Sequence, residues 1–244
     1  MNFSLSRTPL TNGPRRVRVR RVENLTPTYR RIALEGDFAG FDSLGADDHL
    51  RLFFAPAELE VTELSQLGDV PSREYTPVSW GPDELVLDFV VHGEGPGSAW
   101  AEAATPGAGA MVGGPRGSQV IEGRPDHWLL AGDRTALPAI RRFAAQPEAG
   151  VPVEVIAIAH DPADEQEVAS AGELRTTWVR DLPALLEALA AVPRRDGDGF
   201  AFVAAEQSVV KPARAALVEL GFDLERSVVK GYWKRNEAEY HAPH

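Results

Sequence analysis

The hydrophobic pattern of this chain changes once, near Gly123-Arg124-Pro125, and that change restricts its fold more than any other feature. Before it, short alternating apolar and polar runs are separated by clusters of Gly, Pro and Asp, a pattern typical of strands joined by turns. After it, apolar runs alternate with segments of helical periodicity. We therefore expect two domains, an antiparallel β-barrel at residues 15–123 and an α/β domain with an open parallel sheet at residues 124–235.

The pattern also predicts where the main elements lie. Residues 1–14 are polar and contain Pro9, Gly13 and Pro14, which suggests a loose tail or an entry into the first strand. The arginines at residues 15–21 alternate with Val17 and Val19, so we expect a half-buried strand, with anion binding as the alternative. Strands are expected at residues 15–22, 28–34, 49–54, 73–80, 84–91, 110–113, 127–131, 151–159, 174–179, 200–204 and 227–235, and helices at 99–104, 136–144, 182–189 and 213–220.

Composition excludes several classes of function. The net charge of −11 argues against a nucleic-acid-binding protein, because neutralising phosphates requires a basic surface. With no cysteine, the 244-residue chain can form neither disulfides nor cysteine-ligated metal centres. No stretch approaches the roughly 20 apolar residues of a membrane helix, and the N-terminus lacks a signal peptide's apolar core. We therefore expect a cytoplasmic protein with no membrane insertion.

The stretch from Arg73 to Trp80 combines cationic, aromatic and hydroxyl side chains in one expected strand. Because side chains alternate across a strand, Arg73 and Tyr75 should share one face and Thr76 should point to the other. This arrangement suits a flat aromatic ligand with a phosphate tail, since tyrosine can stack on a ring and arginine can grip phosphate. The alternative is a core tyrosine beside a surface arginine.

A glycine-rich turn, His92-Gly93-Glu94-Gly95-Pro96-Gly97-Ser98, connects an expected strand to an expected helix. Backbone N–H groups and the helix dipole at such a junction can hold a pyrophosphate, and Ser98 is a suitable N-cap. The spacing differs from the Gly-x-Gly-x-x-Gly of dinucleotide folds, and Pro96 removes one N–H donor. A tight turn followed by a capped helix therefore remains the alternative.

The expected parallel sheet should bind its ligand at the carboxyl ends of its strands. In this chain these ends are Ala131 to Thr135, Ala159-His160-Asp161 and Ala205-Glu206.

Taken together, these motifs resemble the siderophore-interacting protein family, flavin-containing ferric-siderophore reductases related to ferredoxin reductases. The resemblance covers nearly the whole chain, from Arg15 to Arg235. It implies an FAD-binding β-barrel followed by an NAD(P)H-binding α/β domain. The matching motifs are Arg73-x-Tyr75-Thr76-Pro77-Val78, His92 to Ala101, Gly114-Pro115-Arg116-Gly117-Ser118, Ala131-Gly132-Asp133-x-Thr135-Ala136-Leu137-Pro138-Ala139-Ile140 and Gly231-Tyr232-Trp233.

The resemblance implies roles for individual residues. The chain departs from the family at two positions. Ala205 replaces a glycine before Glu206 on the nicotinamide side, and Arg134 replaces an acidic residue. We consider two interpretations of Arg134, one that it favours the 2′-phosphate of NADPH and one that it is solvent-exposed without a role. The FAD-binding residues implied are Arg73, Tyr75, Thr76, Val78, His92, Gly95, Pro96, Gly97, Ser98, Trp100, Thr135 and Ala136.

The implied activity is reduction of a ferric siderophore to release Fe(II), with electrons from NAD(P)H or a reduced ferredoxin. Lys230, Lys234 and Arg235 could form a basic platform for an anionic siderophore, or could merely solubilise the last strand. We expect no iron site in the protein, since cysteine is absent and histidines such as His241 and His244 lie in the tail. The alternatives are an electron carrier of the flavin or ferredoxin reductase type with another acceptor, and a siderophore-binding protein without enzymatic activity.

Overall fold

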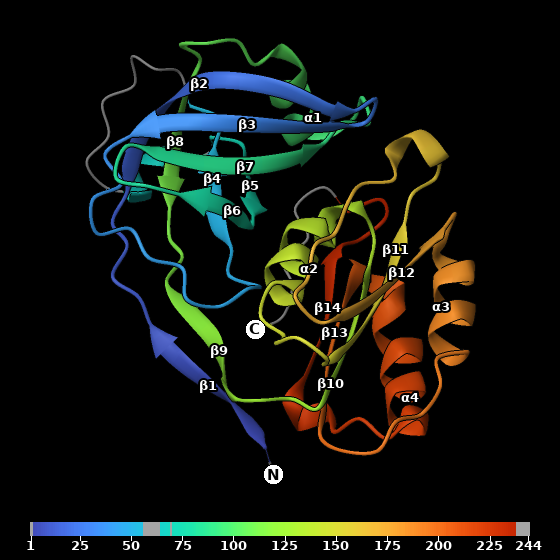
Figure 1. Ribbon diagram of the computed structural model, residues 1–244. Coiled ribbons are helices and arrows are strands. Elements are labelled where there is room, and N and C mark those ends of the chain that lie inside the picture. Colours follow the sequence, from blue (N-terminus) through green and yellow to red (C-terminus); the bar gives the residue numbers. More distant parts are fainter. Residues whose placement is uncertain (1, 56–63, 69, 238–244) are drawn as a thin grey trace. The chain divides into compact units, whose positions relative to one another are not determined.

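Figure 1 shows the computed structural model of the chain, which describes residues 2–55, 64–68 and 70–237. Internal contacts divide the chain into two compact units. The barrel unit spans Arg7–Val120, and the α/β unit joins the chain from Ile121 onward to the N-terminal segment that ends at Ser6. Among the described residues, no helix is long and apolar enough to cross a membrane.

The barrel unit is built on a seven-stranded antiparallel sheet that curls around one apolar core (Figure 1). The strand order is β5-β4-β8-β2-β3-β7-β6. Among the described residues of this unit the only α-helix is α1 (Gly95–Ala103), which follows β7 and contributes Ala101 to the core. The strands are β2 (Arg15–Thr26), β3 (Tyr29–Gly36), β4 (Leu50–Phe53), β5 (Ser72–Tyr75), β6 (Pro77–Trp80), β7 (Glu84–Val90) and β8 (Gly109–Gly113), and the 3₁₀ turn η1 covers Leu64–Leu67.

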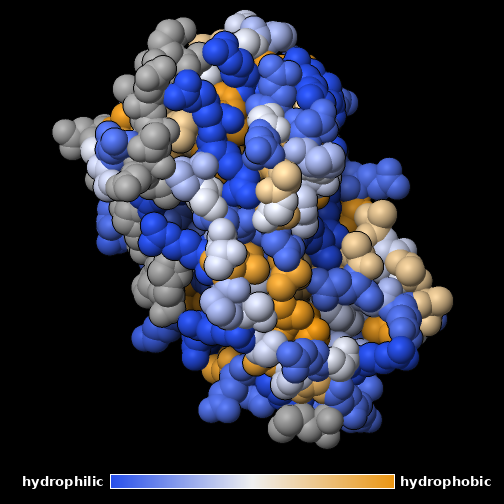
Figure 2. All heavy atoms as spheres, turned by 90° about the vertical axis from the view of Figure 1, so that its left-hand side faces the viewer, coloured by the Kyte–Doolittle hydropathy of each residue, from blue (hydrophilic) through white to orange (hydrophobic). Residues whose placement is uncertain are grey.

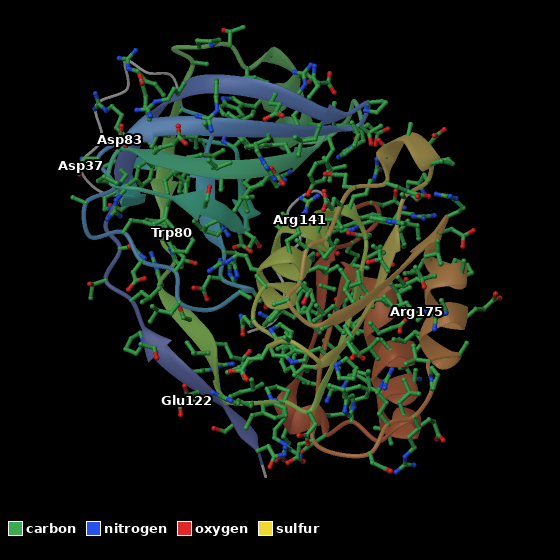
Figure 3. The ribbon with its side chains drawn as sticks, in the orientation of Figure 1. Asp37, Trp80, Asp83, Glu122, Arg141 and Arg175 are labelled. Atoms are coloured by element: carbon green, nitrogen blue, oxygen red, sulfur yellow. The ribbon has the colours of Figure 1, made fainter. Side chains whose placement is uncertain are left out.

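Alternation along β2 places its valines inside and its arginines outside, as the sequence predicted. Val17 and Val19 are each 1% exposed, whereas Arg16 and Arg18 are exposed. Further along the strand, Arg20 donates to Asp83 at 2.9 Å, at the end of the barrel unit where Figure 3 labels that residue. On the face drawn in Figure 2, hydrophilic side chains cover most of the barrel unit. These arginines therefore form a solvated, partly ion-paired face.

The prediction of one strand from Arg73 to Trp80 was wrong, because the chain breaks at Thr76 into β5 and β6. β5 pairs only with β4 and β6 only with β7, so the two strands form opposite edges of the same sheet. The peptide at Thr76 thus connects the two edges of a sheet that has curled around on itself. Thr76 itself is 7% exposed.

A two-stranded sheet, β1 (Phe3–Pro9) with β9 (Gly117–Gly123), was not predicted. The polar residues before Pro14 had suggested a loose tail or an entry into the first strand. Phe3 is the only buried residue of β1: it is 3% exposed, and its ring centroid lies 6.2 Å from that of Phe200. The order of β1 therefore depends on partners distant in sequence.

The α/β unit has a five-stranded parallel sheet, as predicted, with strand order β12-β11-β10-β13-β14. The strands are β10 (His127–Gly132), β11 (Pro152–Ile158), β12 (Glu173–Val179), β13 (Gly199–Glu206) and β14 (Ser227–Trp233). The helices are α2 (Leu137–Ala144), α3 (Leu182–Ala190) and α4 (Val210–Leu220), and the 3₁₀ turns are η2 (Arg134–Ala136), η3 (Pro162–Asp164), η4 (Gln207–Val209) and η5 (Leu224–Arg226).

Helices cover both faces of this sheet (Figure 1). On one face, Phe143 of α2 packs 4.9 Å from Phe202 and 5.0 Å from Phe200. On the other face, leucines of α3 and α4 form a buried cluster with every second residue of β10 and β13. Because both faces are covered, β10 is buried at every position. The polar groups therefore lie at the carboxyl ends of β10 and its neighbouring strands.

Candidate functional site

In the barrel unit, β5 and the start of α1 meet through Tyr75 and Gly97. A side chain at Gly97 would collide with the Tyr75 hydroxyl, and its next neighbours would be Arg73 Cγ at 3.5 Å and Phe54 Cζ at 3.6 Å. Arg73 and Tyr75 therefore share one side of β5, as predicted, and that side faces the first turn of α1. Glycine at position 97 allows this close approach.

Tyr75 belongs to a cluster of four aromatic side chains. Its ring centroid lies 4.4 Å from that of Phe89, and Trp100 of α1 lies 5.5 Å from Phe89 and 5.6 Å from Phe54. Phe89 is 1% exposed, while the other three are half-buried. Burial raises the pKa of the Tyr75 hydroxyl and the Arg73 guanidinium opposes this, so the phenol is neutral at physiological pH.

The glycine turn before α1 differs from the prediction, because Ser98 is not an N-cap. The helix begins at Gly95, its N-cap is Glu94, and Ser98 is 4% exposed within the first turn. The Ser98 hydroxyl oxygen accepts the N–H groups of His92 at 2.9 Å and Gly93 at 3.0 Å, and the hydroxyl donates to Glu102 at 3.1 Å. Ser98, in the first turn of α1, therefore stabilises the preceding glycine turn through these hydrogen bonds.

The N-terminus of α1 has properties that suit a phosphate group. The Glu94 side chain makes no capping hydrogen bond, and Pro96 has no N–H. Gly93 and Gly95 adopt φ of +76° and +74°, and no described residue other than their chain neighbours lies within 4 Å of where their side chains would be. The half-buried Arg73 lies beside the same turn and donates to its neighbour's carbonyl at Ser72. An uncapped helix start, an open glycine turn and a guanidinium together fit the pyrophosphate of a dinucleotide.

The remaining predicted residues of the barrel unit have varied exposure. Val78 and Pro96 are half-buried, and His92 is exposed at the mouth of the turn. The structure brings Arg73, Tyr75, Gly97 and Trp100 into one neighbourhood around α1.

In the α/β unit, the carboxyl end of β10 carries the carboxylate of Asp133, within the segment that the sequence placed at the ligand edge. Asp133 Oδ1 accepts the backbone N–H of Thr135 at 2.8 Å and its hydroxyl at 2.5 Å. Asp133 Oδ2 accepts the indole N–H of Trp233 at 2.7 Å. Thr135 is exposed and Ala136 is fully buried beneath it. Asp133 thus joins the end of β10 to the end of β14, one hundred residues later.

The neighbouring strand β13 ends in a second carboxylate, Glu206. It accepts the N–H and the hydroxyl of Ser208 on one oxygen and the backbone N–H of Arg235, at 3.3 Å, on the other. Partial burial opposes ionisation, but these hydrogen bonds outweigh it and lower the pKa of Glu206. Ala205 is fully buried in the cluster that faces α4, so its methyl group lies in the core.

Arg134 does not have the solvent exposure of the second interpretation, while its role toward the 2′-phosphate of NADPH stays a prediction. Its side chain is only 15% exposed, and its guanidinium lies 3.8 Å from the buried carboxylate of Asp164. Arg141, labelled on α2 in Figure 3, donates to Gln166 at 2.8 Å in the same segment. Arg134 is therefore an internal ion-pair partner, and solvent exposure is excluded.

The three residues predicted to bind the siderophore lie at the end of β14. Lys230 is half-buried, Arg235 is exposed, and the ammonium of Lys234 is paired with Glu237. Tyr232 packs 6.3 Å from Phe202 in the core, whereas Trp233 is 39% exposed. His241 and His244 lie outside the residues that the structure describes. The hydrogen bond from Trp233 to Asp133 was missed, because no local pattern links positions so far apart.

Both parts of the chain match models of one protein family. Residues 18–119 match the siderophore-interacting FAD-binding domain, and residues 125–236 match the siderophore-interacting protein model. The NADPH-dependent ferric-chelate reductase of Escherichia coli K12 is 31% identical over 238 residues, covering 90% of this chain and 92% of that protein.

Solved structures agree with this assignment. A siderophore utilization protein from T. fusca is 31% identical, with a TM-score of 0.85 and 98% of each chain covered. A ferredoxin NADP+ reductase from Neisseria gonorrhoeae, 13% identical with a TM-score of 0.63, covers 91% of this chain and all of its own, and shows the ferredoxin reductase-like fold. The predicted family and fold are confirmed: this chain belongs to the siderophore-interacting protein family.

Proposed function

We propose that this protein is an FAD-dependent reductase that uses NADPH to reduce ferric siderophores and release iron as Fe(II). The observation that carries the proposal is the uncapped N-terminus of α1 beside Arg73 and Tyr75, within the part that matches an FAD-binding domain. In this proposal residues 15–123 bind FAD and residues 124–235 bind the nicotinamide donor.

The barrel unit would hold FAD through groups that tolerate its negative charge. Arg73 and the N–H groups at the start of α1 would bind the pyrophosphate, with Gly95, Pro96 and Gly97 forming the close approach. Tyr75, as a neutral phenol, would stack on the ring system, and Thr76 and Val78 would line the ring edge. His92 at the mouth of the turn and Trp100 in the aromatic cluster would complete the pocket.

Bound FAD would supply the redox chemistry, accepting a hydride and passing electrons singly to ferric iron. Iron is then released because hard oxygen ligands hold Fe(II) less tightly than Fe(III). Thr135 and Ala136 are proposed to reach the cofactor from the end of β10. The side chains would bind and orient the cofactor and substrate and would exclude water. No side chain needs to bond the metal.

The siderophore would dock beside the cationic end of β14, at Lys230, Lys234 and Arg235. Catecholate and hydroxamate complexes are often anionic, so this local basic character would oppose the acidic net charge of the protein. Lys234 is paired with Glu237, so a bound siderophore would compete with that carboxylate for the Lys234 ammonium. We place the reaction in the cytoplasm, where reduced nicotinamide is available, and cell fractionation tests that placement.

The visible spectrum of the purified protein tests the proposal directly. We expect a yellow protein whose flavin absorbance falls when NADPH is added anaerobically and returns when a ferric siderophore follows. A colourless protein that takes up no FAD would reduce the function to siderophore binding. Bleaching by NADPH that is reversed by cytochrome but not by ferric siderophores would identify an electron carrier, and bleaching only by reduced ferredoxin would change the donor.

Two substitutions separate the two proposed sites. Tyr75→Ala should lose flavin, whereas Lys234→Ala should keep flavin and reduce ferric siderophores more slowly. Lys211→Ala is the matched control for charge, because Lys211 is an exposed lysine on α4. Equal flavin content and equal rates in all three variants would contradict the assignment of both sites.

A further inference from the structure

The two ends of α1 lack caps supplied by the helix itself. At the N-terminus, the Glu94 side chain makes no capping hydrogen bond. At the C-terminus, the last turn contains no basic residue, and the C-cap residue Ala104 is extended, with φ of −60° and ψ of 126°. A helix that ends in this way leaves its last backbone carbonyls without partners from its own turn. Donors for these carbonyls therefore come from another element or from water.

Arg30 of β3 supplies such donors. Its Nη1 donates to the carbonyl oxygen of Ala101 at 2.8 Å and to that of Glu102 at 2.9 Å. Arg30 pairs with Phe89 of β7 and precedes the fully buried Ile32 by two residues, so its side chain leaves β3 on the core-facing side. A charged group on that side costs free energy unless it is hydrogen-bonded. The two carbonyls of α1 thus account for the inward direction of this arginine.

The side chain of Glu102 connects this end of α1 to the glycine turn at the other end. Its Oε1 accepts the hydroxyl of Ser98 at 3.1 Å and the backbone N–H of Gly93 at 3.1 Å. The Ser98 hydroxyl oxygen in turn accepts the N–H of His92 and shares that of Gly93. A continuous series of hydrogen bonds therefore runs from Arg30 on β3, through the last turn of α1, to the turn at the proposed phosphate site.

We propose that Arg30 and Glu102 are positioning residues that make the flavin site selective for FAD over flavins without phosphate. Arg30 holds the C-terminal end of α1 and offsets the negative end of its dipole, while Glu102 holds the glycine turn against the first turn of the helix. The N–H groups at the helix start are then fixed in direction before a pyrophosphate binds, which lowers the entropy cost of binding. Neither side chain needs to contact the cofactor. This inference rests on the proposed function, since it concerns the same FAD site.

Titration of the full-length, flavin-free protein with FAD and with riboflavin tests the inference, because riboflavin has the same ring system and no phosphate. Flavin fluorescence measures both affinities. Arg30→Met removes the charge and the donors, so FAD affinity should fall about fivefold. Riboflavin affinity should change little, and the absorption bands of bound FAD should keep their wild-type positions, because the ring site is not altered. Arg30→Lys keeps a cation at the helix end and should lose less. The exposed Arg18→Met on β2 is the matched control and should change neither affinity.

Two substitutions of Glu102 separate its position from its charge. Glu102→Gln keeps an oxygen that can accept the N–H of Gly93 and the hydroxyl of Ser98, whereas Glu102→Ala keeps no acceptor. Both variants lose the negative charge, so the difference between them measures positioning alone. We expect Glu102→Ala to bind FAD severalfold more weakly than Glu102→Gln, with riboflavin bound equally by both. Alanine is the better helix former, so a loss of helix propensity would not explain the weaker binding.

The outcomes distinguish this inference from the proposed function. If Arg30→Met lowers both affinities by the same factor, or shifts the absorption bands of bound FAD, its role is only structural and the inference is wrong. If Glu102→Ala and Glu102→Gln bind FAD equally, Glu102 does not position the turn. If the wild-type protein binds FAD and riboflavin equally tightly, selection by the phosphates is wrong while a flavin-dependent reductase stands. If it binds neither flavin, the proposed function and this inference fail together.

Discussion

The two units handle the junction between a strand and the following helix in opposite ways. In the α/β unit, each such junction at the ligand edge has a carboxylate that accepts a backbone N–H, of a 3₁₀ turn at three junctions and of the α-helix itself at α3. In the barrel unit, the junction from β7 to α1 has glycines, and its N-cap residue Glu94 makes no side-chain hydrogen bond. The carboxylates of the α/β junctions are Asp133, Asp161, Asp181 and Glu206.

This difference separates the kinds of ligand that each junction accepts. A helix start already capped by a carboxylate has its N–H donors satisfied and repels a second anion, whereas an uncapped start attracts one. The start of α1 in the barrel unit therefore suits the pyrophosphate of FAD better than the carboxylate-capped junctions of the α/β unit do. Four substitutions test how independent the two units are, beginning with the largest expected effect.

Phe3→Ala should destabilise the α/β unit and leave the flavin site intact. Phe3 is 3% exposed, packs on Phe200, and has the Arg226 guanidinium 5.0 Å from its ring centre. Deleting such a ring costs about 3 kcal/mol of unfolding free energy. Urea titration measures the cost, and flavin absorbance reports on the barrel unit. Phe3→Leu should lose about 1 kcal/mol, and equal stability of both variants with wild type would show that β1 does not anchor this unit.

Gly97→Ala should disturb the flavin site by pushing on the Tyr75 hydroxyl. Overpacking of this kind costs about 2 kcal/mol and would displace Tyr75 from its stacking position. We expect a lower melting temperature and loss of bound FAD. The double variant with Tyr75→Phe removes the oxygen, after which the nearest atoms are 3.5 Å away, so stability should recover. No recovery in the double variant would contradict the proposed contact.

Glu94→Asp should make the barrel junction resemble those of the α/β unit. Aspartate is a good N-cap, and its shorter side chain can accept the N–H of Gly97. The flavin-free protein should gain about 1 kcal/mol in unfolding free energy, while its FAD affinity falls because a carboxylate now occupies the phosphate position. Glu94→Gln serves as the control for charge alone. A Glu94→Asp variant that binds FAD more tightly would contradict the role of the uncapped helix start in binding phosphate.

The smallest expected effect is that of Glu206→Gln on the pH dependence of stability. Its pKa is lowered in the folded state, so the ionised carboxylate stabilises the protein above the ordinary pKa of about 4.5. That contribution is lost as the pH falls through the depressed folded pKa. Glu206→Gln should therefore reduce stability near pH 7 and make it less dependent on pH in the acid range. Chemical denaturation at several pH values measures this, with the exposed Glu219→Gln on α4 as the control.

Local patterns in the sequence predicted much of this protein. The alternation of Val17 and Val19 with arginines, and the apolar runs after residue 124, report directly which faces are buried, because side-chain periodicity differs between strands and helices. They gave the antiparallel sheet, the parallel sheet and its helices. The motifs around Tyr75 and Gly97 gave the family. Each of these patterns involves only residues that are close together in the sequence.

Only the tertiary structure decided which distant groups meet. The break at Thr76 depends on how far the sheet curls, the burial of Ser98 depends on where α1 begins, and the order of β1 depends on Phe200. The bond between Asp133 and Trp233 joins two strand ends one hundred residues apart. Hydrogen-bond partners across such separations are selected by packing of the whole unit, so the sequence determined the elements and their buried faces, while the fold determined the chemistry at their ends.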